Sequence, residues 1–351
     1  MKCLFRILAG GGLVLAAVSS VHAQTGTSVA CCTAAAAPPV APILPTDYLG
    51  WTNAFRLENE QTVAVLVPDI GRLVHFAPRE GISPFRLEAS MQGKRPAADE
   101  RFFNIGGDWF WPVAQPRWNM LSDNGQDWPP PAVLSDLPWS CSAWTDAGGA
   151  QCALLTREYG PPLNILASRL YRLEPGSSAL VVQQRIERTG DSDVPVVLWN
   201  ISQIARAVQI ALPVEKHSKF RGGLKVLMGS TPDRKQLSRC NGAVIYRVAP
   251  GAETKLGSDS SRAWIAAARD TGVIFESVRN TAPGEYPDGG CLVEIYSNEG
   301  LGYSEIETLS PELKLEPGTV LENTLRIEIS PQDSPPDGCA LAVTARTLAG
   351  E

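Results

Sequence analysis

The chain has 351 residues, of which 44% are hydrophobic and 19% are charged, a composition that excludes disorder over most of its length. Its 31 glycines and 28 prolines place a helix-breaking residue about every six positions, which excludes long helical bundles and helical solenoids. The net charge of −6 argues against nucleic acid as a partner, because such partners select strongly basic surfaces.

The first 23 residues have the features of a secretory signal peptide. A positively charged start precedes an apolar run at residues 7–18, and small residues lead to a cleavage site after Ala23. The run is short for a bilayer span, and no later stretch reaches the roughly 18 apolar residues that a transmembrane helix needs. The sequence therefore predicts a periplasmic or secreted protein, with a lipoprotein acylated at Cys31 as the alternative.

The rest of the chain divides by composition. Residues 24–47 are rich in Ala, Pro and Thr and almost uncharged, which predicts a flexible spacer. We expect one folded domain over residues 48–332 and a C-terminal tail at residues 333–351.

Short segments with strand character recur through the folded region, and turn sequences separate them. The segments are 63–67, 72–76, 167–173, 179–186, 195–199, 244–248, 265–268, 273–278, 292–296, 303–308 and 320–329. The sequence Leu-Glu-Pro-Gly occurs at 173–176 and again at 315–318, and its Gly suits the third position of a type II turn. No stretch keeps helical periodicity over four turns. We therefore predict an all-β fold, a large antiparallel β-sandwich with at most one or two short helices.

The cysteine spacing suggests an oxidising compartment. Cys141 and Cys152 flank a turn sequence, and a two-residue loop between them would place them opposite each other in a hairpin. The sequence predicts a disulfide at this hairpin. It leaves open which of Cys240, Cys291 and Cys339 is unpaired.

Metal and cofactor sites have little support in the sequence. There is no Cys-x-x-Cys pair, no P-loop, no dinucleotide fingerprint and no Gly-x-Ser-x-Gly or His-Glu-x-x-His motif. Only two of the three His would remain after signal removal, too few for a three-His site within one chain. We expect no cofactor and no metal.

Six of the nine Trp lie between residues 109 and 144, in a Pro-rich region that we expect to form mostly long loops. Indole faces can stack on sugar rings while nearby polar groups bind the hydroxyls, so this region is a candidate carbohydrate site. The alternative is that these Trp side chains pack the loops onto the sandwich. The candidate binding residues are Asp108, Trp109, Trp111, Gln115 and Trp118.

Two further features concern acid–base chemistry. In a strand at 303–308, Glu305 and Glu307 point to one face, where they are either solvated or line a polar cleft. His75 lies in another predicted strand and is either a structural residue or a catalytic one.

Three stretches, at 51–72, 173–203 and 286–318, together resemble galactose-mutarotase-like domains in their order and turn sequences. The block Gly-Gly-Asp-Trp-x-Trp-Pro at 106–112 resembles the bacterial branch called domain of unknown function 4380. The resemblance covers roughly residues 50–330. It implies a twisted β-supersandwich with a sugar-binding face.

The resemblance also implies roles. Aldose mutarotases use a Glu base on the anomeric hydroxyl and a His acid on the ring oxygen. Here Glu305 or Glu307 would be the base, with the register between them open. Where that family carries an Asn-His pair, this chain has Asn-Ile-Ser-Gln, and Gln203 can bind a sugar but cannot donate a proton. We expect Gln203 and Arg72 to contact the sugar, with His75 as the remaining His that could reach it.

These observations support three hypotheses. The first is an exported carbohydrate-binding protein whose ligand lies between the Trp-rich loops and the Glu-bearing strand. The second is an aldose 1-epimerase-like enzyme with a Glu base. The third is a cell-envelope structural protein without a working site. The identity of the sugar and the oligomeric state are open.

Overall fold

The computed structural model describes residues 39–97, 99–121, 128–248, 253–279 and 282–351. The predicted signal peptide, Cys31 and most of the predicted spacer lie outside the described residues. The end of the predicted spacer is described, and it contains the strands β1 (Pro39–Pro42) and β2 (Thr46–Tyr48).

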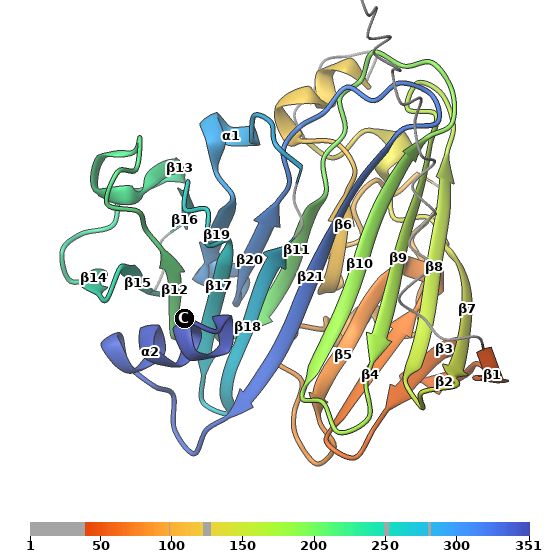
Figure 1. The fold of residues 1–351 in the computed structure, drawn as a ribbon, viewed down its shortest axis with the longest axis horizontal. Coiled ribbons are helices and arrows are strands. Elements are labelled where there is room, and N and C mark those ends of the chain that lie inside the picture. Colours follow the sequence, from red (N-terminus) through yellow and green to blue (C-terminus); the bar gives the residue numbers. More distant parts are fainter. Residues whose placement is uncertain (1–38, 98, 122–127, 249–252, 280–281) are drawn as a thin grey trace, which may run out of the picture. The chain divides into compact units, whose positions relative to one another are not determined.

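The strands of the described residues form two antiparallel sheets of eleven and ten strands (Figure 1). In order across the larger sheet, the strands are β1, β7 (Ser140–Asp146), β8 (Gln151–Tyr159), β9 (Ile165–Leu173), β10 (Ala179–Arg188), β21 (Val320–Pro331), β18 (Gly272–Arg279), β17 (Trp264–Arg269), β12 (Gln209–Pro213), β15 (Ala243–Arg247) and β14 (Leu237–Cys240). In the smaller sheet they are β13 (Lys225–Gly229), β16 (Glu253–Ser258), β19 (Val293–Asn298), β20 (Tyr303–Leu309), β11 (Trp199–Ala205), β6 (Gly107–Trp111), β5 (Arg72–Pro78), β4 (Thr62–Val67), β3 (Trp51–Glu58) and β2.

Helices are few and short among the described residues. The α-helices are α1 (Pro287–Gly290) and α2 (Gly338–Ala349). The 3-10 helices are η2 (Pro68–Ile70), η3 (Ala89–Met91), η4 (Gln115–Met120), η5 (Ala132–Leu134), η6 (Arg221–Gly223) and η7 (Glu299–Leu301). None of the described helices is long and apolar enough to cross a membrane. The predicted antiparallel β-sandwich is confirmed.

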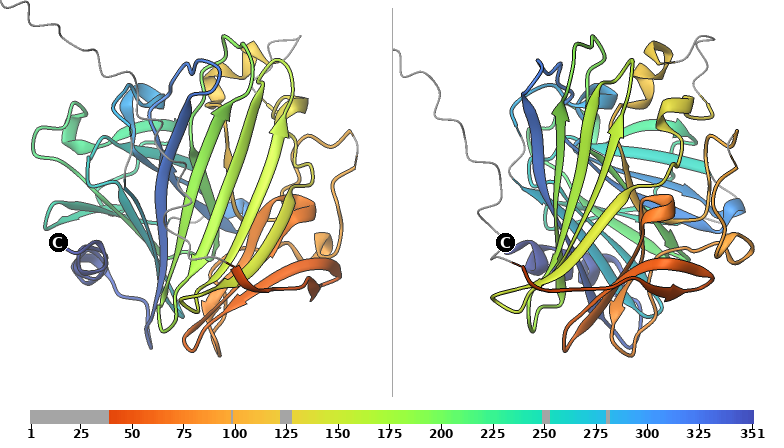
Figure 2. Two further views of the ribbon diagram at one scale, coloured as in Figure 1. Left: turned by 45° about the vertical axis from the view of Figure 1, so that its right-hand side comes forward. Right: turned by 90° about the vertical axis from the view of Figure 1, so that its right-hand side faces the viewer.

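Burial alternates along the central strands of the larger sheet. In β9 and β10 alternate side chains are buried against the other sheet, and these strands run beside β8 and β21 in both views of Figure 2. The Leu-Glu-Pro-Gly turns are also as expected, because Gly176 and Gly318 have φ of 67° and 81°, the left-handed region that a type II turn needs at this position.

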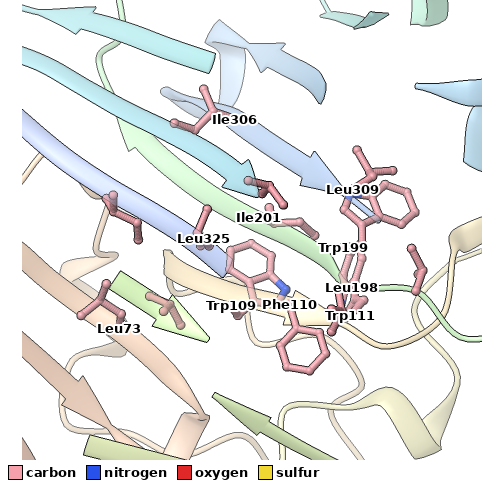
Figure 3. Close-up of a cluster of buried hydrophobic side chains, with 14 of the residues drawn as sticks. Leu73, Trp109, Phe110, Trp111, Leu198, Trp199, Ile201, Ile306, Leu309 and Leu325 are labelled. Atoms are coloured by element: carbon pink, nitrogen blue, oxygen red, sulfur yellow. The ribbon is translucent and has the colours of Figure 1, made fainter. Parts of the chain in front are cut away.

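The Gly-Gly-Asp-Trp block differs from the expectation of long loops. Residues 107–111 form β6, which pairs with β11 and β5 inside the smaller sheet. Every residue of β6 is buried, so its sequence lacks the polar alternation that marks a half-exposed strand. Figure 3 shows Trp109, Trp111 and Trp199 of β6 and β11 close together, and Ile306 of β20 belongs to the same buried cluster.

The predicted hairpin disulfide between Cys141 and Cys152 is wrong. In the β7–β8 hairpin Thr145 pairs with Gln151, and the turn between them is longer than two residues. Cys141 therefore lies opposite Leu155, and Cys152 lies opposite Trp144.

The disulfide of the described residues joins Cys240 to Cys339. Cys291 is therefore the unpaired member of the C-terminal three, and its thiol is buried. The bridge ties β14 to α2, which lies in the segment expected to be a tail. Leu341, Ala342 and Ala345 of this helix are buried in a small cluster on the larger sheet.

Candidate functional site

A pocket of about 380 Å³ opens on the smaller sheet. Its floor consists of side chains from β16, β19, β20, β11 and β6, and loop residues form one wall. The lining residues are Phe102, Asn104, Trp111, Gln115, Trp128, Ile201, Met228, Glu253, Lys255, Tyr296, Leu301, Tyr303, Glu305 and Glu307.

Strand alternation sets which side chains reach this pocket. Asn200 faces the larger sheet, where it contacts Arg169 and Gln184, so its neighbour Ile201 faces the opposite way and lines the pocket. Ile201 pairs with Glu307 on β20. The pocket therefore lies on the face of the smaller sheet that points away from the larger sheet.

The same face carries two rows of polar side chains across the sheet. In one row Lys255, Tyr296, Glu305 and Gln203 occupy paired positions on β16, β19, β20 and β11. In the next row Glu294 pairs with Glu307. Three of the residues predicted for the site, Glu305, Glu307 and Gln203, are thus neighbours.

The two carboxylate oxygens of Glu307 differ in their hydrogen bonds. Its Oε2 accepts hydrogen bonds from the Trp199 indole N–H at 2.7 Å and from Lys255 Nζ at 3.0 Å. Its Oε1 is buried and has no hydrogen-bond partner among the described residues.

Lys255 links Glu307 to a third carboxylate. Its Nζ lies 3.0 Å from Glu294 Oε2 as well as from Glu307 Oε2. Burial opposes the charged ammonium, but the charges of Glu307 and Glu294 raise the pKa of Lys255 above its ordinary value. Burial raises the pKa of Glu294 well above its usual range, against the pull of Lys255. Two buried carboxyl groups thus share the single ammonium of Lys255.

Glu305 accepts fewer hydrogen bonds than Glu307. Its Oε1 accepts one hydrogen bond, at 2.9 Å, from the Gln203 side-chain amide. Burial, and then the charge of Glu307, raise the pKa of Glu305 to about 7. The Glu305 carboxyl therefore binds a proton more readily than an ordinary glutamate does.

Gln203 is oriented by Arg86. Arg86 Nη1 donates to Gln203 Oε1 at 3.0 Å, which turns the amide nitrogen toward Glu305 and Asn104. The backbone carbonyl of Arg86 lies against Gly106, where a Cβ would approach it to 2.0 Å. Gly106, at φ 103°, therefore permits the close approach that brings Arg86 to the site.

An aromatic wall faces the polar rows. Trp111 packs edge-on against Trp118 and at a tilt against Phe102. Trp128 stacks on Trp118 with 6.2 Å between ring centroids. Trp118 is fully buried, but Trp128 leaves 52% of its surface exposed beside the pocket. Trp128 is thus a partly exposed indole in the pocket lining.

Four predicted residues line the pocket, namely Glu305, Glu307, Trp111 and Gln115. The structure does not bring Arg72, Asp108, Trp118 or His75 to the pocket lining. Gln203 is also absent from the lining, because it is fully buried behind Glu305, to which it donates a hydrogen bond. Trp109 is buried next to the pocket, in the row of Ile201 and Glu307.

The remaining predicted residues have structural contacts. Arg72 is buried below Trp109, with its guanidinium carbon 4.0 Å from the ring centroid, and donates to the carbonyls of Phe103 and Gly106. His75 Nδ1 lies 3.2 Å from the hydroxyl of Tyr48.

Asp108 lies between the two sheets. Its carboxylate contacts Arg169 Nη2 at 2.7 Å, Asn200 Nδ2 at 2.7 Å and Ser202 Oγ at 3.0 Å. Glu276 on β18 approaches the same Ser202 hydroxyl at 2.6 Å. Burial, and then the charge of Asp108, raise the pKa of Glu276 to about 8. These five side chains are inaccessible to solvent and connect the sheets.

Sequence reasoning missed several residues of the site. Lys255 and Glu294 lie in alternating strand sequences, but only the cross-strand register places them next to Glu307. Charged residues between apolar neighbours, as in Val293-Glu294-Ile295, were the available signal. Within the described residues no group of three or more His, Cys, Asp and Glu is arranged to hold a metal ion.

Solved structures share this fold at low sequence identity. The Slr1438 protein from Synechocystis sp. PCC 6803 is 15% identical with a TM-score of 0.53, and the match covers 84% of this chain and 99% of that one. A candidate mutarotase (YeaD) from Salmonella typhimurium is 11% identical with a TM-score of 0.55, covering 83% and 97%. A TPR-domain containing protein from Parabacteroides distasonis is 16% identical with a TM-score of 0.55, covering 81% and 48%.

The sequence matches no family model and no curated protein, so the resemblance to domain of unknown function 4380 stays a prediction. At these identities the structural likeness is informative about fold. The chain has the galactose-mutarotase-like β-sandwich fold.

Proposed function

We propose that this protein binds a carbohydrate in the pocket of the smaller sheet. The observation that carries the proposal is the half-exposed indole of Trp128, which lines a pocket of about 380 Å³ together with Glu305, Glu307 and other hydrogen-bonding side chains. Pockets of this order hold small ligands. An aromatic face opposite carboxylate and amide groups matches a sugar ring, which has apolar C–H faces and hydroxyls around its edge.

Trp128→Ala is expected to weaken sugar binding about tenfold, because an exposed aromatic platform is worth about 1.4 kcal/mol when it covers a ring. A glycan array identifies the ligand, and calorimetry with that ligand measures the change in Kd. Trp144→Ala is the matched control, since Trp144 lies on β7 of the other sheet and should leave Kd unchanged. Unaltered affinity in Trp128→Ala, or no binding to any sugar, would contradict the proposal.

A second candidate function is aldose 1-epimerase-like isomerisation with Glu307 as the base. It is favoured by the contacts of Glu307, which has one oxygen fixed by Trp199 and Lys255 and the other buried without a partner. A general base needs an ionised oxygen that is free to accept the substrate proton. In ring opening that proton comes from the anomeric hydroxyl.

Glu307→Gln is expected to slow anomer exchange by about 10²- to 10⁴-fold, the usual contribution of a general base, while Kd changes far less. Saturation-transfer NMR measures exchange, and calorimetry measures Kd on the same sample. Glu253→Gln is the control, because Glu253 lines the pocket but is hydrogen-bonded to Tyr296. An equal loss of binding in Glu307→Gln would make Glu307 a ligand contact rather than a base.

We also propose that the protein is exported. The features of residues 1–23 support a signal peptide. The disulfide between Cys240 and Cys339 is compatible with an oxidising compartment.

A further inference from the structure

We propose that Glu305 is the proton donor of the same site, so that two carboxyl groups on one strand carry out both proton transfers of sugar ring opening. This inference rests on sugar binding and on the second candidate function. It assigns the proton donor to the ring oxygen, a role for which the sequence has no His near Gln203. No His is among the described residues that line the pocket.

The first support is geometric. Glu305 and Glu307 lie on the pocket face of β20, and both line the pocket. Residues i and i+2 of a strand are separated by about 6.6 Å along its axis. The oxygen of the anomeric hydroxyl and the ring oxygen are bonded to the same carbon, so two carboxyl groups beside each other can address both atoms of one bound sugar.

The second support is the difference between their partners. Glu307 Oε2 accepts hydrogen bonds from an indole N–H and an ammonium, while its Oε1 has no partner among the described residues. Glu305 receives one neutral amide N–H from Gln203, and the charge of Glu307 disfavours a second charge beside it. Carboxyl pairs whose environments separate their pKa values commonly divide into an acid and a base.

Several charged or titratable groups set the environment of Glu305. Glu307 is on its own strand, Lys255 is on β16, and Tyr296 on β19 is its cross-strand neighbour. Tyr303 lies two residues earlier on β20. Arg86 reaches the site through Gln203, while the buried Arg72 lowers the pKa of Glu305 slightly. Burial and Glu307 outweigh these cations, and the pKa of Glu305 is raised to about 7.

The proposed reaction balances within the pair. Glu307 Oε1 accepts the proton of the O1 hydroxyl, and the O1 electrons form the C1=O bond. The C1–O5 bond breaks with its electron pair on O5, and O5 takes the proton of Glu305. Rotation about C1–C2 and the reverse transfers close the other anomer and return both carboxyl groups to their starting states. No cofactor is consumed.

The pH profile of anomer exchange tests this assignment. The rate is expected to fall as pH rises through about 7, because deprotonation of Glu305 (pKa about 7) removes the donor. Glu305→Gln should lower the exchange rate at least about 100-fold and abolish this fall, while sugar affinity stays within about threefold. Glu305→Asp keeps a carboxylic acid and should retain part of the rate, which separates proton donation from loss of folding.

The outcomes distinguish this inference from the functions on which it rests. Exchange in Glu305→Gln at the wild-type rate would overturn the role of Glu305 and leave the Glu307 base intact. Binding without exchange in the wild-type protein would overturn both catalytic roles and leave carbohydrate binding intact. Absence of sugar binding would remove the proposed function and this inference with it. A wild-type rate that does not fall above pH 7 would also overturn the assignment.

Discussion

Arg169→Met is expected to lower the free energy of unfolding by about 3–5 kcal/mol, the usual effect of removing one partner of a buried ion pair. Arg169 and Asp108 are both inaccessible to solvent, and their closest atoms are 2.7 Å apart. Arg169 Nη2 also donates to Asn200 at 2.7 Å. Without the guanidinium, the Asp108 carboxylate would remain buried beside Glu276 with no cation to compensate it.

Urea unfolding at pH 7 measures this change. The control is Arg185→Met, which breaks the partly exposed pair of Arg185 and Glu187 on β10 and should cost less than about 1 kcal/mol. The double variant in which Asp108 is also replaced by Asn should recover part of the loss, because it removes the orphaned charge. A loss in Arg169→Met as small as that of the control would show that Asp108 is neutralised in another way.

Asp108 was predicted to bind the sugar, but it lies between the two sheets, outside the pocket. Neighbouring residues of a strand point to opposite faces, so Asp108 cannot share a face with Trp109 and Trp111 once β6 is a strand. Sequence reasoning treated this block as loop, in which that restriction does not apply. The sequence therefore predicts that Asp108 binds the sugar, whereas in the structure Asp108 pairs with Arg169 of the larger sheet.

The two-residue periodicity of a strand is enough to predict which of its side chains share a face. It placed Glu305 and Glu307 on one face of a strand, and they lie together in the pocket. It could not place Lys255 and Glu294, because their contacts with Glu307 depend on the register of β16, β19 and β20. Register between strands is a long-range property that hydrophobic pattern and turn geometry determine jointly.

The cysteines illustrate the same limit. The pairing of Cys141 with Cys152 depended on a two-residue turn, and the longer turn moves Cys152 opposite Trp144. The observed pair, Cys240 and Cys339, is separated by 99 positions, and no local pattern connects β14 with α2. Packing of α2 on the larger sheet brings the two thiols together.

Cys339→Ser is expected to lower the free energy of unfolding by about 4 kcal/mol, because the bridge closes a loop of 99 positions and so restricts the unfolded chain. The midpoint of urea unfolding should shift in the variant, and reduction of the wild-type protein should produce the same shift. Reduction of the variant is the control, since its remaining cysteines form no bridge among the described residues and should give no further change.

The apolar contacts of α2 determine whether removal of the Cys240–Cys339 bridge releases the helix alone or destabilises the whole sandwich. Leu341, Ala342 and Ala345 are fully buried against the larger sheet, so the helix is expected to stay docked after the bridge is removed. Hydrogen exchange in α2 should then increase only together with global unfolding. If α2 exchanges freely while the unfolding midpoint is unchanged, the bridge anchors the helix locally and does not stabilise the sandwich. The distinction is physical, because a loop constraint acts on the unfolded chain whereas a local anchor acts on the native state.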